Sequence, residues 1–494
     1  RILGEVVGRD NGTDKALVLE RVDQATPEGR GALSIDTSAG KVQFTSTLSN
    51  AALAGSGQVG LMNGLDLNGV TLGMNALVQD GTVDVLAAGG LTVNAVLALE
   101  TEQNRTNQIF LRGAQTVDGT GRIELSDGVQ SGSNINRLLG ISESSTETEI
   151  FTFGSGITIA GAGRVETNRN EDSLRILGTL EGSADGALEV NNLDNAGATV
   201  LVDSSSGQVV LGDFIANTTF ASVAGQSAEV NLRASADLNA VTFDLDAILG
   251  EFNATESAFV TGGLTVNGQL TLAAGTNRTA ELEFDGAQTL GGTGTVILSD
   301  ARSPFADQPF NRLDFDGLLA EAESFVIASG VTVQGTGTIN VIDAGDTLAI
   351  EGSVLADNGV LEISNGARLE PVSGTLGVMD DAILEVRDGF GLAAGGTLRI
   401  GLSDQGVGRI DLTGNATLDQ GGTLALDVAD SFVFTEGDTF EIVTGIDTLS
   451  GDFADFDGFD LDGNLAFELI QPSSDTLALR VTTDDLAAPF IDIA

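Results

Sequence analysis

The sequence predicts an all-β protein of short stacked strands, a right-handed parallel β-helix, also called a β-solenoid. Many runs of three to seven residues alternate apolar and polar side chains, as in Leu361-Glu362-Ile363, and this period of two turns one side of each strand inward. The chain has 66 glycines and only 6 prolines, a balance typical of tight turns between strands. No long segment has a helical period, and each glycine inside a helix would cost about 1 kcal/mol.

An internal duplication is the third observation behind this prediction. Residues 89–94 (GGLTVN) return as residues 262–267, an offset of 173 residues. Similar matches extend the two copies to approximately residues 66–192 and 237–365. A finer pattern, Val-x-Gly-x-Gly-x-Ile, recurs inside each copy, as at Val117–Ile123. Repetition on both scales is typical of architectures in which each unit stacks on its neighbour.

The repeats divide the chain into four expected regions. These are an N-terminal β segment or cap at 1–60, a first solenoid repeat unit at 61–222, a second at 223–375, and a C-terminal β region at 376–494. Short strands also fit a sandwich or a propeller, but similar positions often recur after about 20–25 residues, which favours a solenoid. Roughly 20 rungs spaced by about 4.8 Å would form a rod near 100 Å. Beyond about residue 376, where the duplication ends, a β-sandwich array stays open.

The net charge of −49 limits the classes of partner. Binding to nucleic acid or to an anionic membrane needs clustered basic residues, and the chain has only 22, of which Lys15 and Lys41 are the only lysines. Strong acidity fits a well-solvated surface, divalent cations or a salty habitat. Because 41% of the residues are hydrophobic, intrinsic disorder is not expected.

Absent residue types limit the chemistry and the cellular context. The chain has no cysteine and no histidine, which excludes disulfides, thiol chemistry and Cys/His metal sites. No run of about 18 apolar residues is present, so no membrane-spanning helix is predicted. The start at Arg1 is neither an initiator methionine nor a signal peptide. We infer that the numbering begins after a cleavage or that upstream sequence is not included.

Three C-terminal segments resemble a known family of proteins. Residues 421–428 (GGTLALDV), 437–443 (GDTFEIV) and 449–453 (LSGDF) resemble the C-terminal stretch of autotransporter passenger domains and related large bacterial surface proteins. The resemblance implies export across two membranes, a right-handed parallel β-helix, and roles in adhesion, aggregation or surface layering. Autotransporters end in an outer-membrane barrel, whereas this sequence stops at Ala494. Either a barrel has been removed or anchoring works differently.

Catalysis is not expected, although a β-helix can also carry polysaccharide lyases and hydrolases. Such sites need an acid, a base or nucleophile, and platforms for sugar rings. Without histidine, Ser–His nucleophilic catalysis is excluded, and without tryptophan or tyrosine only phenylalanine can stack on a sugar. The adjacent pairs Asp380-Asp381 and Asp484-Asp485 are poor catalytic pairs, because neighbouring side chains in a strand point to opposite faces. We expect no catalytic and no cofactor-binding residues.

Calcium is the one ligand that the residue pattern favours, without requiring it. Five carboxylates lie within eleven residues, and hard oxygen ligands suit Ca²⁺. These calcium candidates are Asp452, Asp455, Asp457, Asp460 and Asp462. Their spacing fails the EF-hand pattern, so an acidic solvated loop is the competing interpretation.

These observations together predict an extracellular structural protein of a bacterial cell surface. An open solenoid exposes strand edges at its ends, so we expect self-assembly into a homopolymeric filament, sheath or layer. Two alternatives stay open: a monomeric adhesin rod that binds cell-surface glycans or other cells, and a β-helix polysaccharide lyase or hydrolase. Neither nucleic acid nor a membrane span is expected.

Overall fold

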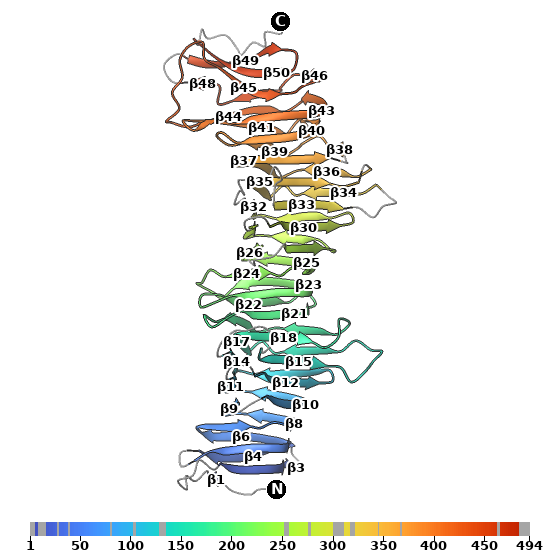
Figure 1. Cartoon of the computed structure of the whole chain (residues 1–494), viewed down its shortest axis with the longest axis vertical. Coiled ribbons are helices and arrows are strands. Elements are labelled where there is room, and N and C mark those ends of the chain that lie inside the picture. Colours follow the sequence, from blue (N-terminus) through green and yellow to red (C-terminus); the bar gives the residue numbers. More distant parts are fainter. Residues whose placement is uncertain are drawn as a thin grey trace. The chain divides into compact units, whose positions relative to one another are not determined.

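The computed structural model is all-β, with no helix in the residues that it describes, and its parallel strands form a β-solenoid of about 15 turns (Figure 1). The described residues are 5–7, 16–26, 29–37, 40–79, 82–101, 105–127, 135–250, 256–274, 278–299, 311–316, 322–343, 345–365, 368–461 and 465–483. By its contacts, the chain divides into two compact units, Arg1–Asp246 and Ala247–Ala494. Within the described part of the chain, no helix has the length and apolar character that crossing a membrane requires.

The first unit contains three stacks of parallel strands, one for each side of a turn. One stack contains β8 (Leu65–Leu72), β10 (Val83–Val93), β12 (Asn107–Arg112), β15 (Arg137–Ile141), β18 (Gly163–Thr167), β21 (Leu188–Asp194), β23 (Val209–Ser222) and β24 (Glu229–Leu232). The second stack, which β10, β21 and β23 also join, adds β13 (Gln115–Gly119), β16 (Ile150–Phe153), β19 (Ser173–Ile176) and β25 (Asp237–Asp244). The third contains β9 (Asn75–Val78), β11 (Val96–Thr101), β14 (Arg122–Asp127), β17 (Thr158–Gly161), β20 (Thr179–Gly182) and β22 (Thr199–Asp203), and continues into β23. The chain enters these stacks through β1 (Glu5–Val7), β2 (Leu17–Asp23), β3 (Ala25–Thr26), β4 (Gly29–Asp36), β5 (Val42–Ser49), β6 (Ala51–Ser56) and β7 (Gln58–Leu61).

The second unit is built in the same way. One stack contains β26 (Asp246–Leu249), β29 (Gln269–Leu272), β32 (Thr295–Leu298), β35 (Thr332–Val341), β37 (Ser353–Asn365), β39 (Thr375–Val378), β41 (Thr397–Ser403), β44 (Thr423–Val428) and β47 (Asp455–Asp457). Another contains β27 (Glu256–Val260), β30 (Ala280–Asp285) and β33 (Asn311–Asp316), then runs through β35 and β37 to β40 (Ile383–Gly391), β43 (Arg409–Gln420), β45 (Thr439–Thr444) and β46 (Thr448–Gly451). The third contains β28 (Leu264–Val266), β31 (Thr289–Gly292), β34 (Ser324–Ile327), β36 (Thr347–Ile350) and β38 (Arg368–Leu369). The remaining strands are β42 (Gly406–Val407), β48 (Asp460–Leu461), β49 (Leu465–Ser473) and β50 (Thr476–Thr483).

Inward side chains of successive turns stack directly on one another and form the core. Val85, Ile109, Leu138 and Val165 are opposite each other on consecutive strands of the first unit, and all are buried. This alternation is the one that the sequence predicts, and the parallel β-solenoid is confirmed. The handedness stays a prediction.

Buried asparagines complete the turns where a backbone group would lack a partner. Asn107 and Asn136 are fully buried, and the amide of Asn136 donates to the carbonyl oxygens of Leu99 (2.9 Å) and Ser126 (2.8 Å). The Asn136 oxygen in turn accepts the backbone N–H of Asn107 at 3.2 Å. Because an unsatisfied buried carbonyl costs about 1–3 kcal/mol, these side chains let the chain turn without that loss.

The prediction of about 20 rungs is wrong; the solenoid has about 15 turns. Val83 is opposite Asn107 and Gln108 is opposite Arg137, so successive turns take 24 and 29 residues. The loops between strands lengthen the turns, and alternation within strands does not reveal loop length.

The solenoid continues well past the end of the duplication and then changes its pairing. Parallel pairs extend through β44 to β47. Those strands therefore continue the solenoid and do not form the β-sandwich that the sequence left open beyond about residue 376. At the end, β50 pairs antiparallel with both β45 and β49. The rings of Phe432, Phe434, Phe440 and Phe467 pack together beside this hairpin, with centroids 5.5–6.4 Å apart. These phenylalanines therefore pack together at the C-terminal end of the second unit.

Candidate functional site: an acidic face on strands β30 and β33

A concentration of negative charge with a defined geometry lies on neighbouring strands β30 and β33. Their outward side chains are mostly carboxylates, because both strands alternate inward apolar residues with outward charged ones. We call this set the acidic face: Glu281, Glu283 and Asp285 on β30, and Asp314 and Asp316 on β33, with Arg312 as the basic side chain among them. Glu283 lies opposite Asp314, and Asp285 lies opposite Asp316.

Like charges directly opposite each other on adjacent strands destabilise a sheet. The acidic face contains two such pairs, and Arg312 is opposite only Glu281. The face therefore stores unfavourable electrostatic energy that a cationic ligand, or a proton, would relieve.

The surroundings of Asp314 favour its protonated form. Arg312 contacts Asp314 (Nη2 to Oδ2, 2.7 Å) and Glu281 (Nη1 to Oε1, 3.5 Å), so both carboxyl groups converge on one guanidinium. The Asp314 side chain is only 3% exposed, and its Oδ1 has no hydrogen-bond partner as long as the group is ionised. A protonated Asp314 can instead donate to Glu281, and Ser257 also donates to Glu281 (3.1 Å).

The pKa shifts agree with this arrangement. Burial, together with the hydrogen bond to Glu281, raises the pKa of Asp314 to about 8. The same hydrogen bond lowers the pKa of Glu281. Burial and the neighbouring carboxylates raise the pKa values of Glu283 and Asp316. The pair of Glu281 and Asp314 thus shares one proton near neutral pH, as close carboxyl groups do.

The first copy of the duplication shows that this chemistry is not required by the fold. Strands β12 and β15 are its equivalents of β30 and β33, and they carry Gln108, Phe110, Arg112, Leu139 and Ile141 where the second copy carries its five carboxylates. The same two strands therefore stack with neutral, apolar and basic outward side chains. The acidic face is a property of the second copy alone.

Ion pairs balance the charges on the next strands of the first copy. Arg164 contacts Glu189 (2.6 Å), which also contacts Arg233 (2.7 Å), and Arg137 contacts Glu166 (3.5 Å). In the second copy, Thr338 and Asn340 replace Arg164 and Glu166. The second copy keeps the equivalent of Arg137, which is Arg312, but lacks the ion pairs that Arg164 and Glu166 form in the first copy.

The predicted calcium residues lie elsewhere, in and around β47 near the C-terminal end. Asp452, Asp455, Asp457 and Asp460 are exposed, and Asp462 lies outside the described residues. Asp455 and Asp457 share the outward side of β47, with Phe456 between them facing the opposite way. In the described ranges, no group of three or more acidic side chains is arranged to hold a metal ion. Calcium binding at this segment stays a prediction.

Sequence reasoning missed the acidic face, although the signal was present. The runs ELEFD (281–285) and RLDFD (312–316) both alternate acids with apolar residues, which places their acids on one side of a strand. Their pairing across 31 residues depends on the length of an intervening turn. That length does not follow from the alternation.

Comparison with known proteins adds no identity to this geometry. No protein-family model matches the chain, and no curated protein matches its sequence.

Proposed function

We propose that this chain is an extracellular structural protein of a bacterial cell surface that makes its contacts through the side faces of its β-solenoid. The resemblance of residues 421–453 to autotransporter passenger domains supports the location. The repeated parallel stacking of strands in each unit supports a structural role, because it presents successive rows of outward side chains at a fixed spacing.

The antiparallel hairpin at the C-terminal end is the observation on which the mode of contact rests. A filament built end to end would need an open parallel edge onto which the next subunit could stack. Instead, β50 occupies the edge of β45, and β49 pairs with the other side of β50. This arrangement favours the monomeric adhesin rod over an end-to-end filament, while a layer built through side faces stays compatible with it.

The paired carboxyl groups call for a comparison with the lyase or hydrolase alternative. Two carboxyl groups with pKa values shifted in opposite directions are typical of acid–base pairs in enzymes. A catalytic acid must reach its substrate, however, and the Asp314 side chain is 3% exposed and held by Arg312. The geometry therefore favours binding or structure over catalysis at this pair.

Light scattering after size exclusion, with negative-stain electron microscopy, tests the proposal on the full chain. We expect monomers in the unmodified chain. The substitution Leu479→Pro removes a donor from the middle of β50 and should promote association by releasing the edge of β45. Ser474→Pro, in the turn between β49 and β50, is the matched control and should stay monomeric. Regular end-to-end filaments of the unmodified chain would overturn the proposal.

A further inference from the structure

A cavity lies near the C-terminal end of the second unit, where the solenoid meets the antiparallel hairpin (Figure 1). Residues at the ends of β43 and β46 line it, together with residues of β49 and β50. Its volume is about 350 Å³. Because a cavity of about 150 Å³ is enough to hold benzene, this one has room for a single ring-sized organic molecule with its substituents.

The end of strand β43 explains why space remains there. Ala416, Leu418 and Gln420 are buried at every second position, so Gln420 continues the inward side of the strand. Gln420 lies opposite Gly451 on β46, and glycine has no side chain to pack against it. Gly451 has φ +74°, and a Cβ added there would lie 2.9 Å from Oδ1 of Asp419. A larger residue is therefore disfavoured at this position, and the space next to Gln420 stays open.

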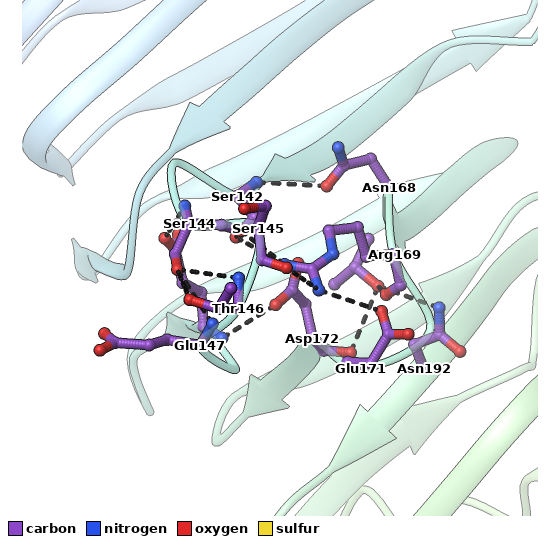
Figure 2. Close-up of polar contacts among 12 residues, drawn as sticks. Ser142, Ser144, Ser145, Thr146, Glu147, Asn168, Arg169, Glu171, Asp172 and Asn192 are labelled. Carbon is purple, nitrogen blue, oxygen red and sulfur yellow. Dashed lines mark hydrogen bonds and ion pairs between the residues drawn. The ribbon is translucent and has the colours of Figure 1, made fainter.

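The amide of Gln420 is buried in the wall of this cavity without a hydrogen-bond partner among the described residues. Only 4% of Gln420 is exposed. Asn192 of the first unit is buried to the same degree, but its Nδ2 donates to Thr167 Oγ1 at 2.9 Å (Figure 2). Buried polar side chains normally have such partners. The amide of Gln420 is therefore available to a molecule bound in the cavity.

Further polar side chains line the cavity. Ser450 and Asp452 are exposed, so the cavity opens to solvent on their side. Gln471 donates from Nε2 to the carbonyl oxygen of Ser474 (3.3 Å), which leaves its amide oxygen able to accept a hydrogen bond. None of the described residues that line the cavity is basic. An anionic ligand would meet a carboxylate without a compensating positive charge, whereas a neutral ligand with hydroxyl groups would find both donors and acceptors.

The rest of the wall is apolar and includes Leu449, Leu469 and Leu477. We propose that this cavity binds one pyranose ring of a neutral carbohydrate. The C–H groups of the ring pack on the leucines, and its hydroxyl groups form hydrogen bonds with Gln420 and Asp452. An apolar wall with a few polar groups that converge on the ligand is typical of binding sites for small molecules.

The cavity is suited to binding a sugar and not to cleaving it. Glycoside hydrolysis normally uses two carboxyl groups that flank the scissile bond, and Asp452 is the one carboxylate among the described residues that line the cavity. The inference goes beyond the side-face contacts proposed above and does not depend on them, because the cavity is formed within one chain.

Saturation-transfer NMR on the full chain tests the proposal, with methyl β-glucoside, methyl β-galactoside, methyl α-mannoside and N-acetylglucosamine as probes. We expect saturable binding of at least one of these sugars. Gln420→Leu keeps an inward side chain of similar size and removes the amide, so it should fold and bind that sugar about tenfold more weakly. Gln58→Leu, at a cavity of about 100 Å³ in the first unit, is the matched control and should leave binding unchanged. No saturable binding of any of the four sugars would overturn the proposal, as would equal binding by Gln420→Leu and the unmodified chain.

A second variant blocks the cavity without changing a buried residue. Ser450 is exposed, so Ser450→Trp should keep the melting temperature of the unmodified chain, while its indole occupies the space of the ring and abolishes sugar binding. Thr448→Trp places the same side chain two residues earlier on β46, outside the lining of the cavity, and should bind the sugar normally. If Ser450→Trp binds the sugar as well as Thr448→Trp does, the sugar binds elsewhere and the proposal is wrong.

Discussion

Replacing Asp314 by asparagine should make the chain less sensitive to alkaline pH. The folded chain holds the Asp314 proton up to a pKa of about 8, whereas the unfolded chain releases it near the ordinary value of 3.8. Between these values the folded state binds more protons than the unfolded state, so the free energy of unfolding decreases as the pH rises through this window. Asparagine has no proton to lose and can still donate to Glu281.

The structure sets an upper limit on the size of this effect. At about 1.4 kcal/mol per pKa unit, the rise from 3.8 to about 8 corresponds to at most about 6 kcal/mol. The lowered pKa of Glu281 opposes part of it, because the two groups share one proton. We therefore expect Asp314→Asn to gain about 2–3 kcal/mol of stability relative to the unmodified chain between pH 5 and pH 9.

The composition of the chain leaves few other titrating groups that could obscure this change in stability. With no histidine, cysteine or tyrosine, few other groups titrate between pH 6 and pH 9. Urea unfolding at a series of pH values gives the free energies, and infrared spectroscopy reports the protonated carboxyl group directly. Leu139, which stands in the position of Asp314 in the first copy, offers the control Leu139→Asn, which should leave the pH dependence unchanged. Parallel pH profiles for Asp314→Asn and the unmodified chain would refute the reasoning.

Three further substitutions test the solenoid itself. Gly335 has φ +119°, and a Cβ added there would lie 2.2 Å from a carbonyl oxygen of the preceding turn. Gly335→Ala should therefore lower the melting temperature far more than Gly64→Ala, because Gly64 has φ +77° and open space around the added Cβ. Equal shifts of the melting temperature would contradict this. Asn136→Ala leaves the buried carbonyl of Leu99, the part-buried carbonyl of Ser126 and the buried N–H of Asn107 without this partner. It should cost about 2–4 kcal/mol in urea unfolding, and a loss below about 0.5 kcal/mol would mean that water replaces the side chain. Phe467→Ala removes ring contacts at the C-terminal hairpin. It should speed amide hydrogen exchange in β49 and β50 and leave exchange in the first unit unchanged. An equal increase of exchange in both units would count against a local end structure.

The sequence by itself determined the class of fold. Alternation in runs such as Leu361-Glu362-Ile363 and glycine at the turns depend only on local geometry, because a strand repeats every two residues. The duplication is likewise visible in the sequence, and equivalent strands recur at the same offset, as β12 and β30 do. Local periodicity and repetition were therefore sufficient to predict a parallel solenoid.

Only the tertiary structure decided which residues of different turns meet. The length of each turn sets the register between strands, and it varies because loops of different length leave the corners. Register brought Glu281, Arg312 and Asp314 together. The sequence instead drew attention to aspartates that are close along the chain, such as Asp455 and Asp457, which lie exposed in one strand. Electrostatic energy depends on distance in space and on burial, and a solenoid sets both through its stacking.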